Sequence, residues 1–155
     1  MSKTPSQTYT EQVHLVLDSD LNGSKRLFGG TLLAWIDITA AICARRHCGR
    51  NVTTASIDNL NFIAPAYAND LVVLCAKVSH VGNTSMEVTV DSYVERLDGK
   101  RTHINSAHVV LVALDENERP CKVPALIPET EEEKAAFTAG EKRRDLRRER
   151  KKENY

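Results

Sequence analysis

FGGTLLAWIDITAAICA, residues 28–44, is a nearly all-apolar segment that begins with Phe28 and two glycines and carries a single carboxylate, Asp37. Its length and composition predict a long helix, and a helix that is apolar on most sides belongs inside a domain. Burying an ionised carboxylate without a partner is costly, so Asp37 has either a structural partner or a chemical role. The glycines favour the chemical role, because they allow a substrate to approach the N–H groups at the helix N-terminus.

One face of this helix is expected to contact a ligand or a second subunit. Gly30 and Asp37 are seven residues apart, almost two turns, so they share a face and lie about 10 Å apart along the axis. The same face carries mostly small residues: Leu33, Ala40, Ala41 and Ala44. A row of small side chains around one acid leaves room for another molecule, and we expect at least a dimer.

The rest of the chain predicts a β-sheet around this helix. The expected order is a strand over 9–17, the helix over 30–47, and strands over 52–62, 70–80, 86–95 and 102–114. In the segment 86–95, apolar residues alternate with polar ones such as Glu87, which predicts one apolar and one solvent-facing side. A strand, a long helix and four strands joined by short turns indicate an α+β domain over residues 1–128.

Residues 129–155 form a charged tail that is predicted to be a C-terminal helix. Acidic residues gather at its start and basic residues at its end, as the helix dipole favours. Glu141, Asp145 and Glu149 each precede an Arg or Lys by three positions, which supports a helix through ion pairs. Two interpretations stay open: a solvated helix with ion pairs along it, or a helix whose cations meet phosphate groups.

Composition argues against several classes of protein. The 21 basic and 21 acidic residues cancel, so the chain as a whole is not expected to bind nucleic acid. No apolar run approaches about 18 residues, so neither a transmembrane helix nor a membrane partner is expected. The first residues lack the apolar core of a signal peptide, and the four cysteines lack paired spacing, which indicates free thiols in the cytoplasm. The histidines and cysteines also lack metal-ligand spacing, so no metal site is expected.

Several short motifs follow one another along residues 10–150. In chain order they are Asn22 before Phe28-Gly29-Gly30, Asp37 in the helix, Val52-Thr53-Thr54 ahead of Phe62 and Pro65, the turn Gly82–Met86, and the basic pair Arg143-Arg144. With these features the chain resembles the hotdog-fold acyl-CoA thioesterases, in particular the cytosolic acyl-CoA hydrolase branch. The resemblance implies a hotdog fold, in which a curled antiparallel five-stranded sheet wraps a long central helix.

The resemblance also implies a reaction and the residues that perform it. Acyl-CoA and water give a free carboxylic acid and coenzyme A, so coenzyme A enters as part of the substrate and no cofactor is implied. Asp37 is implied as general base or nucleophile, and Asn22 of the facing subunit as the residue that positions water or the thioester. Thr54 lies where the family keeps a threonine near the active site. The N–H groups of Gly29 and Gly30 can stabilise the oxyanion on the thioester carbonyl.

The implied binding residues lie in three places along the chain. They are Phe28 before the helix; Gly82, Asn83, Thr84, Ser85 and Met86 in a turn alongside the pantetheine; and Arg143, Arg144 and Arg147 at the nucleotide phosphates. By charge alone, Arg45, Arg46 and Lys77 are further candidates for the phosphates. The chain departs from the family at Lys25, which replaces a glycine in a loop expected near the active site. The family forms homodimers with active sites at the subunit interface, and these often join into a trimer of dimers.

Two alternatives to a thioesterase remain at this point. One is a hotdog acyl-CoA dehydratase, a chemistry that usually pairs an acid with a histidine, whereas this helix has no histidine before His47. The other is a non-catalytic acyl-CoA sensor whose basic tail binds nucleic acid, although no recognition helix is visible. The length of the fatty acyl chain is left open by the sequence.

Overall fold

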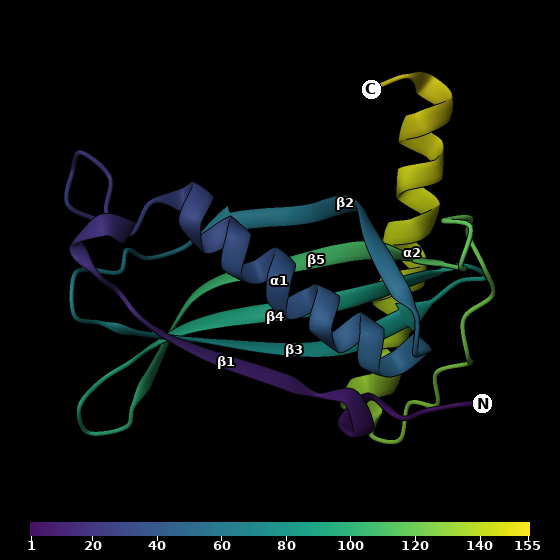
Figure 1. Cartoon of the computed structure of the whole chain (residues 1–155), viewed down its shortest axis with the longest axis horizontal. Helices are drawn as coiled ribbons and strands as arrows, with labels where there is room; N and C mark the ends of the chain where they lie inside the picture. The colour runs from purple at the N-terminus through teal and green to yellow at the C-terminus, as the bar shows by residue number, and fades with distance from the viewer.

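A five-stranded antiparallel sheet curves around one long helix in the computed structural model, which describes residues 1–155 (Figure 1). The elements are β1 (Thr10–Leu15), α1 (Gly29–Cys48), β2 (Asn51–Phe62), β3 (Leu71–Val81), β4 (Ser85–Glu95), β5 (Arg101–Leu114) and α2 (Glu131–Glu153), with 3-10 turns at Pro5–Thr8 and Asp18–Asp20. The α+β prediction and the hotdog arrangement are confirmed. Each predicted element is present, with its expected ends displaced by a few residues.

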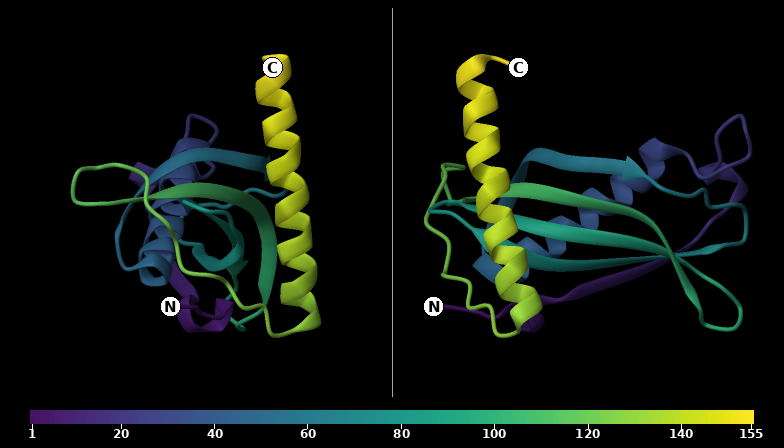
Figure 2. Two further views of the ribbon diagram at one scale, coloured as in Figure 1. Left: turned by 90° about the vertical axis from the view of Figure 1, so that its right-hand side faces the viewer. Right: turned by 180° about the vertical axis from the view of Figure 1, so that it is seen from behind.

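The helix α1 lies inside the curve of the sheet and packs its buried face against the strands (Figures 1 and 2). It ends at Gly49, which adopts a left-handed conformation (φ 66°) and donates its N–H to the Arg45 carbonyl at 2.8 Å. Arg45, Arg46 and His47 in the last turn complement the negative end of the helix dipole. The glycine stop and the basic last turn explain why this boundary could be predicted.

The prediction of which face of α1 is free to contact another molecule is partly wrong. Ala40 and Ala44 are fully buried, and they pack against the core of their own chain. Gly30 is exposed as expected, but the exposed face also includes Ala34 and Ile38, which the prediction did not name. The reason is that α1 is apolar on nearly all sides, so its sequence has too little polar contrast to indicate which side the sheet covers.

The strand order β1-β3-β4-β5-β2 leaves β1 and β2 as the two edges of the sheet. The interior strand β5 is buried at Val109, Val110 and Leu111, as its continuous apolar run predicts. The edge strand β2 has no buried residue along its whole length. Two irregularities in its pairing with β5, at Thr54/Ser56 and at Asp58/Asn61, bend it.

The charged helix α2 packs on the outer face of the sheet, on the side opposite α1 (Figure 2). It covers Glu87 of β4, which is 2% exposed, so the prediction that this position faces solvent is wrong. The alternating pattern of a strand distinguishes polar from apolar positions, but it cannot show that a distant helix brings a counter-charge. Of the three ion pairs predicted within the tail, only Glu141–Arg144 forms, at 3.7 Å. None of the helices combines the length and the hydrophobicity that crossing a membrane requires.

Candidate active site

The carboxylate of Asp37 is half-buried on α1 and contacts the edge strand β2. Thr54 Oγ1 donates a hydrogen bond to Asp37 Oδ1 at 2.5 Å. The other oxygen, Oδ2, accepts no hydrogen bond within the chain. Asp37 therefore has a structural partner, as one of the two interpretations predicts. It also presents one free oxygen, and its chemical role stays a prediction.

The N-terminus of α1 presents two free N–H groups. The Phe28 carbonyl accepts the N–H groups of Thr31 and Leu32, at 3.0 and 3.1 Å, whereas those of Gly29 and Gly30 find no acceptor in the chain. A Cβ at Gly30 would lie 2.6 Å from Cε2 of Phe28, so only glycine allows the aromatic ring to rest there. Two adjacent donors of this kind suit an oxygen that becomes negatively charged.

Asn22 lies in the exposed loop before α1, with its side-chain amide fixed by the backbone. Its Oδ1 accepts the N–H groups of Ser24 and Arg26 at 2.9 and 3.2 Å. These bonds leave the Nδ2 amino group without an acceptor, so Asn22 can act only as a donor toward a ligand. Lys25 in the same loop adopts φ 59°, the left-handed conformation in which a glycine is less strained, and the loop closes despite the substitution.

An apolar cavity of about 340 Å³ adjoins these donors. Its lining is Asn22, Arg26, Leu27, Gly29, Leu32, Phe62, Ile63, Ala64, Pro65, Ala66 and Ile104. Leu32, Ala66 and Ile104 are almost fully buried at its base, while Phe62 and Ile63 are 56% and 61% exposed at its mouth. The cavity therefore joins a polar end to an apolar interior.

The β3–β4 turn forms a second group of free donors at the other end of the sheet. Gly82 N–H donates to the Ser85 carbonyl at 2.8 Å, and the carbonyls of Asn83 and Thr84 accept from neighbouring loops and strands. The N–H groups of Asn83 and Thr84 have no acceptor in the chain. Met86, by contrast, is fully buried in the core, so its side chain does not face this turn's outer surface.

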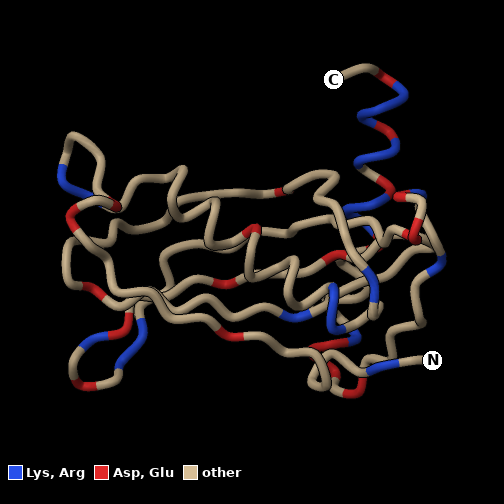
Figure 3. Tube along the Cα trace, in the orientation of Figure 1, with Lys and Arg blue, Asp and Glu red and all other residues tan.

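The three arginines expected at the phosphates have different surroundings on α2, where basic and acidic residues alternate (Figure 3). Arg143 forms a two-pronged ion pair with buried Glu87, at 2.7 and 2.9 Å. Arg147 donates to Asp58 of β2 at 2.6 Å. Arg144 has only a 3.7 Å contact with exposed Glu141, and its Nε is buried without a partner.

The predicted site residues lie in two groups along β2. Asn22, Phe28, Gly29 and Gly30 lie at the Phe62 end, where a Cβ on Gly29 would contact the Phe62 ring. Asp37, Thr54 and the Gly82–Met86 turn lie toward the Asn51 end, because Thr54 and Met86 both pair with Leu111 of β5. Thr54 and Phe62 pair with Leu111 and Asn105, which are six residues apart on β5, so about 20 Å of sheet separates them. On α1 the corresponding separation, from Gly30 to Asp37, is about 10 Å along the axis. No hydrogen bond in one chain joins the two groups.

The sequence did not reveal two sets of residues that support the candidate site. Glu87 and Asp58, which hold the arginines of α2, carry no motif; the only signal was a polar position on a strand and an arginine-rich helix elsewhere. The base of the apolar cavity, Leu32 and Ile104, could not be distinguished from ordinary core.

Comparisons with known proteins identify the family and the fold of this chain. The model of the thioesterase superfamily matches residues 25–98. An uncharacterized acyl-CoA thioester hydrolase of Bacillus subtilis is 38% identical over 97% of this chain and 91% of its own length. An acyl-CoA hydrolase of Staphylococcus aureus, solved with butyryl coenzyme A and coenzyme A, superposes with a TM-score of 0.93 at 34% identity, over 99% of this chain and 94% of that one. A hexameric acyl-CoA thioesterase is 39% identical, with a TM-score of 0.92 over 96% of both chains.

Proposed function

Because this chain belongs to the thioesterase superfamily, we propose that it hydrolyses fatty acyl-coenzyme A to a carboxylic acid and coenzyme A. The observation that carries the proposal is on α1: two free N–H groups open the helix, and a carboxylate with one free oxygen lies further along it. The reaction consumes only water and the thioester, so it calls for no further cofactor.

The proposed chemistry divides between the donors and the carboxylate. The N–H groups of Gly29 and Gly30 bind the thioester oxygen as it becomes negative; losing one such donor typically costs about 3 kcal/mol of transition-state stabilisation. Asp37 Oδ2 either takes a proton from the attacking water, or attacks the carbonyl itself to form an anhydride that water then hydrolyses. In both cases the C–S bond breaks, and the coenzyme A thiolate leaves and takes up the proton that water released. Thr54 orients the carboxylate for either role, and Asn22 donates to the water or to the thioester.

We further propose that each site combines residues of two chains. The edge strand β2 is long, unpaired on one side and flanked by exposed apolar residues such as Phe62 and Ile63. If two β2 strands pair antiparallel, the Phe62 end of one chain meets the Asn51 end of the other. Asn22, Gly29 and Gly30 of one chain then face Asp37 and Thr54 of its partner. The hexameric relative supports a trimer of such dimers.

The apolar cavity supports a fatty acyl substrate. The cavity beside Gly29 has a volume of about 340 Å³ and opens to solvent, and Leu32, Ala66 and Ile104 give it a buried apolar base. An apolar groove of this kind suits the hydrocarbon chain of a fatty acyl group. The thioester would then lie at its polar end, beside the Gly29 N–H group and the Asn22 amide.

Variants of the Staphylococcus aureus hydrolase in which an Asn, an Asp or a Thr is replaced by Ala have also been solved, with TM-scores of 0.93 to 0.94. The candidate site of this chain contains the same three residue types in Asn22, Asp37 and Thr54. This parallel supports the proposed roles.

The experiment that tests the proposal measures thiol release from acyl-CoAs of increasing chain length. We expect release by the parent protein and a loss of about 100-fold or more in kcat in Asp37→Asn, since general-base catalysis contributes that much. Asparagine keeps the shape and still accepts the bond from Thr54, so the variant should fold. Binding of acyl-CoA without thiol release in the parent would instead favour a sensor.

A mixing experiment tests whether the sites are shared between chains. Asn22→Asp and Asp37→Asn are each expected to be inactive alone. Refolded together, half of the dimers contain one of each chain, and one of their two sites is then intact. About a quarter of the parent activity should therefore return. If the mixture stays inactive although hybrid dimers form, each site lies within one chain.

A further inference from the structure

A buried carboxylate fixes the helix α2 to the outer face of the sheet. Glu87 of β4 is 1% exposed at its side chain. Arg143 Nε donates to its Oε2 at 2.9 Å and Arg143 Nη2 to its Oε1 at 2.7 Å, while Ser79 Oγ donates to Oε1 at 2.5 Å. Removing one partner of a buried ion pair leaves an uncompensated charge, so this pair holds α2 strongly at one point.

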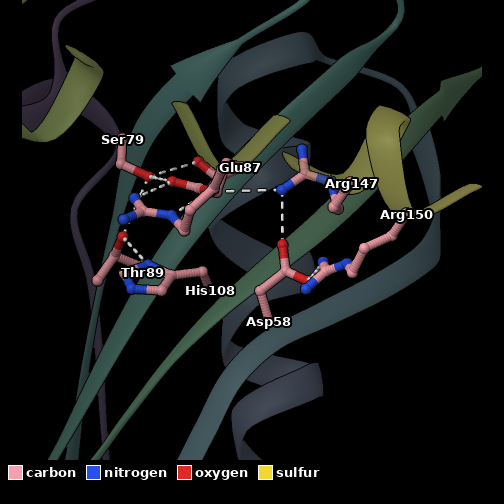
Figure 4. A network of polar contacts seen from close by, with 8 residues as sticks. Asp58, Ser79, Glu87, Thr89, His108, Arg147 and Arg150 are labelled. Carbon is pink, nitrogen blue, oxygen red and sulfur yellow. Dashed lines mark hydrogen bonds and ion pairs between the residues drawn. The ribbon is translucent and has the colours of Figure 1, made fainter. Parts of the chain in front are cut away.

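A chain of hydrogen bonds orients this carboxylate from the sheet (Figure 4). Thr89 Oγ1 donates to Ser79 Oγ at 3.0 Å, and it lies 2.9 Å from His108 Nδ1, which must therefore be the donor in that contact. Burial alone would raise the pKa of Glu87, but the hydrogen bonds from Arg143 and Ser79 outweigh burial and lower it. The carboxylate is thus charged and held in one orientation.

Close packing beside this ion pair removes the remaining freedom of α2. Gly140, one turn before Arg143, is the only buried residue of the helix. A Cβ there would lie 2.6 Å from His80 Cβ and 2.9 Å from Glu87 Oε1. The helix therefore touches β3 and β4 directly, and its rotation about its own axis is fixed.

Arg144, which follows Arg143, lies at the edge of the contact between α2 and the sheet, close to the β3–β4 turn. Its Nη1 lies 3.7 Å from the position of a Cβ on Gly82. Its side chain is 26% exposed, and its Nε has no partner. The free N–H groups of Asn83 and Thr84 belong to the same turn. A guanidinium beside a turn that has two free backbone donors offers the kinds of group that bind the oxygens of a phosphate.

We infer that Glu87 is a positioning residue for coenzyme A: by fixing α2 through Arg143, it holds Arg144 beside the Gly82–Ser85 turn, where a phosphate group binds. This inference rests on the proposed function, since coenzyme A supplies the phosphate. It also divides the arginines of α2 by role. Arg143 and Arg147 neutralise Glu87 and Asp58, and Arg144 meets the ligand.

The experiment compares two thioesters and one nucleotide. The parent, Glu87→Gln and Arg144→Gln are assayed with an acyl-CoA and with the same acyl group on N-acetylcysteamine, which has no phosphate. Binding of adenosine 3′,5′-bisphosphate is measured by calorimetry. We expect Glu87→Gln to raise KM for acyl-CoA and Kd for the nucleotide about tenfold, as loss of one charge-assisted contact does. Its kcat and its activity on the small thioester should change less than about twofold.

Matched variants separate positioning from a general loss of structure. Asp58→Asn removes the ion pairs of Arg147 and Arg150 on the same helix but keeps Glu87, Arg143 and Gly140. It should raise KM by much less than Glu87→Gln does. Arg143→Lys keeps the charge but not the two-pronged geometry, and should raise KM by an intermediate amount. In an Arg143→Gln background, Glu87→Gln should add nothing, since it acts through that residue.

Two results would overturn the inference, and they are distinguishable. A parent that neither binds the nucleotide nor releases thiol from acyl-CoA contradicts the proposed function as well. A parent that does both, with Glu87→Gln unchanged in KM and Kd or with Asp58→Asn weakened equally, contradicts the role of Glu87 alone.

Discussion

Backbone hydrogen bonds fix the orientation of the Asn22 side-chain amide. Two N–H groups of the surrounding loop bind Oδ1, and the amino group is left without an acceptor in the chain. The sequence indicated that Asn22 belongs to the site, but it could not show this orientation, because the bonds arise from the conformation at Lys25 and its neighbours. The same holds for Asp37, whose contact with Thr54 depends on the pairing of two elements.

The variant Asn22→Asp tests the donor role of this residue. A carboxylate still accepts the N–H groups of Ser24 and Arg26, so the loop and the thermal midpoint should be preserved. The donor is lost, and we expect kcat to fall about 100-fold, in the range found for one lost transition-state hydrogen bond. Steady-state kinetics with circular dichroism measure both quantities. Near-parent turnover would show that the amino group takes no part in the reaction.

At the scale of elements, the sequence predicted where helices and strands lie but not how α2 docks. Gly49 ends α1, and alternating residues mark β4, since both signals are local. The pairing of Glu87 with Arg143 joins residues 56 positions apart and has no local signature. The tail was therefore open to interpretation as a solvated helix, whereas Gly140 and Phe137 pack against the sheet.

Gly140→Ala tests how tightly α2 is packed. Alanine favours a helix by about 1 kcal/mol over glycine, but its Cβ would overlap His80 Cβ and Glu87 Oε1. Overpacking costs about 1–3 kcal/mol, so we expect a net loss of stability and a lower midpoint in urea unfolding. Thr138→Ala, at an exposed position of the same helix, is the control. It gains helix propensity without overpacking, so its midpoint should stay level or rise slightly. A stabilised Gly140→Ala protein would mean that α2 shifts freely over the sheet.

At the scale of the molecule, the fold distributes the candidate site over both ends of one edge strand. Motif order along the sequence indicated the members of the site, but distance along the sequence says little about which of them meet in one chain. Asp37 and Asn22 are 15 positions apart in sequence, yet they belong to different groups in space. The arrangement could be seen only when the register of β2 with β5 was known.

The histidines make the stability of the whole molecule depend on pH. Burial lowers the pKa of His14, His47, His80 and His108. In the unfolded chain these histidines have pKa values of about 6.5. Below that pH the unfolded state binds more protons than the folded state, so the free energy of unfolding falls. As far as the histidines are concerned, urea unfolding should give constant stability between about pH 7 and 8 and a decline toward pH 5. Above about pH 8 the raised pKa values of the Cys43 and Cys48 thiols add a separate loss. The lowered pKa of Glu87 adds a further loss below about 4.5.

His47→Gln is the matched variant for this pH dependence. His47 is fully buried, and its Nε2 donates to the Pro124 carbonyl at 2.9 Å, a bond that a glutamine amide can replace. Removing this one group should flatten the decline by up to about 1.4 kcal/mol per pH unit. An unchanged slope would show that His47 takes up its proton without unfolding.

The separation of Asn22 from Asp37 along β2 has a consequence for dilution if each site combines two chains, as proposed. The rate per chain would then be set by the fraction of chains that are paired. Diluted well below the dissociation constant of the pair, the total rate falls with the square of the chain concentration. In that range, the rate of thioester hydrolysis in a cell would fall by a larger factor than the concentration of the chain does. A small reduction in synthesis of the chain would therefore slow hydrolysis more than proportionally.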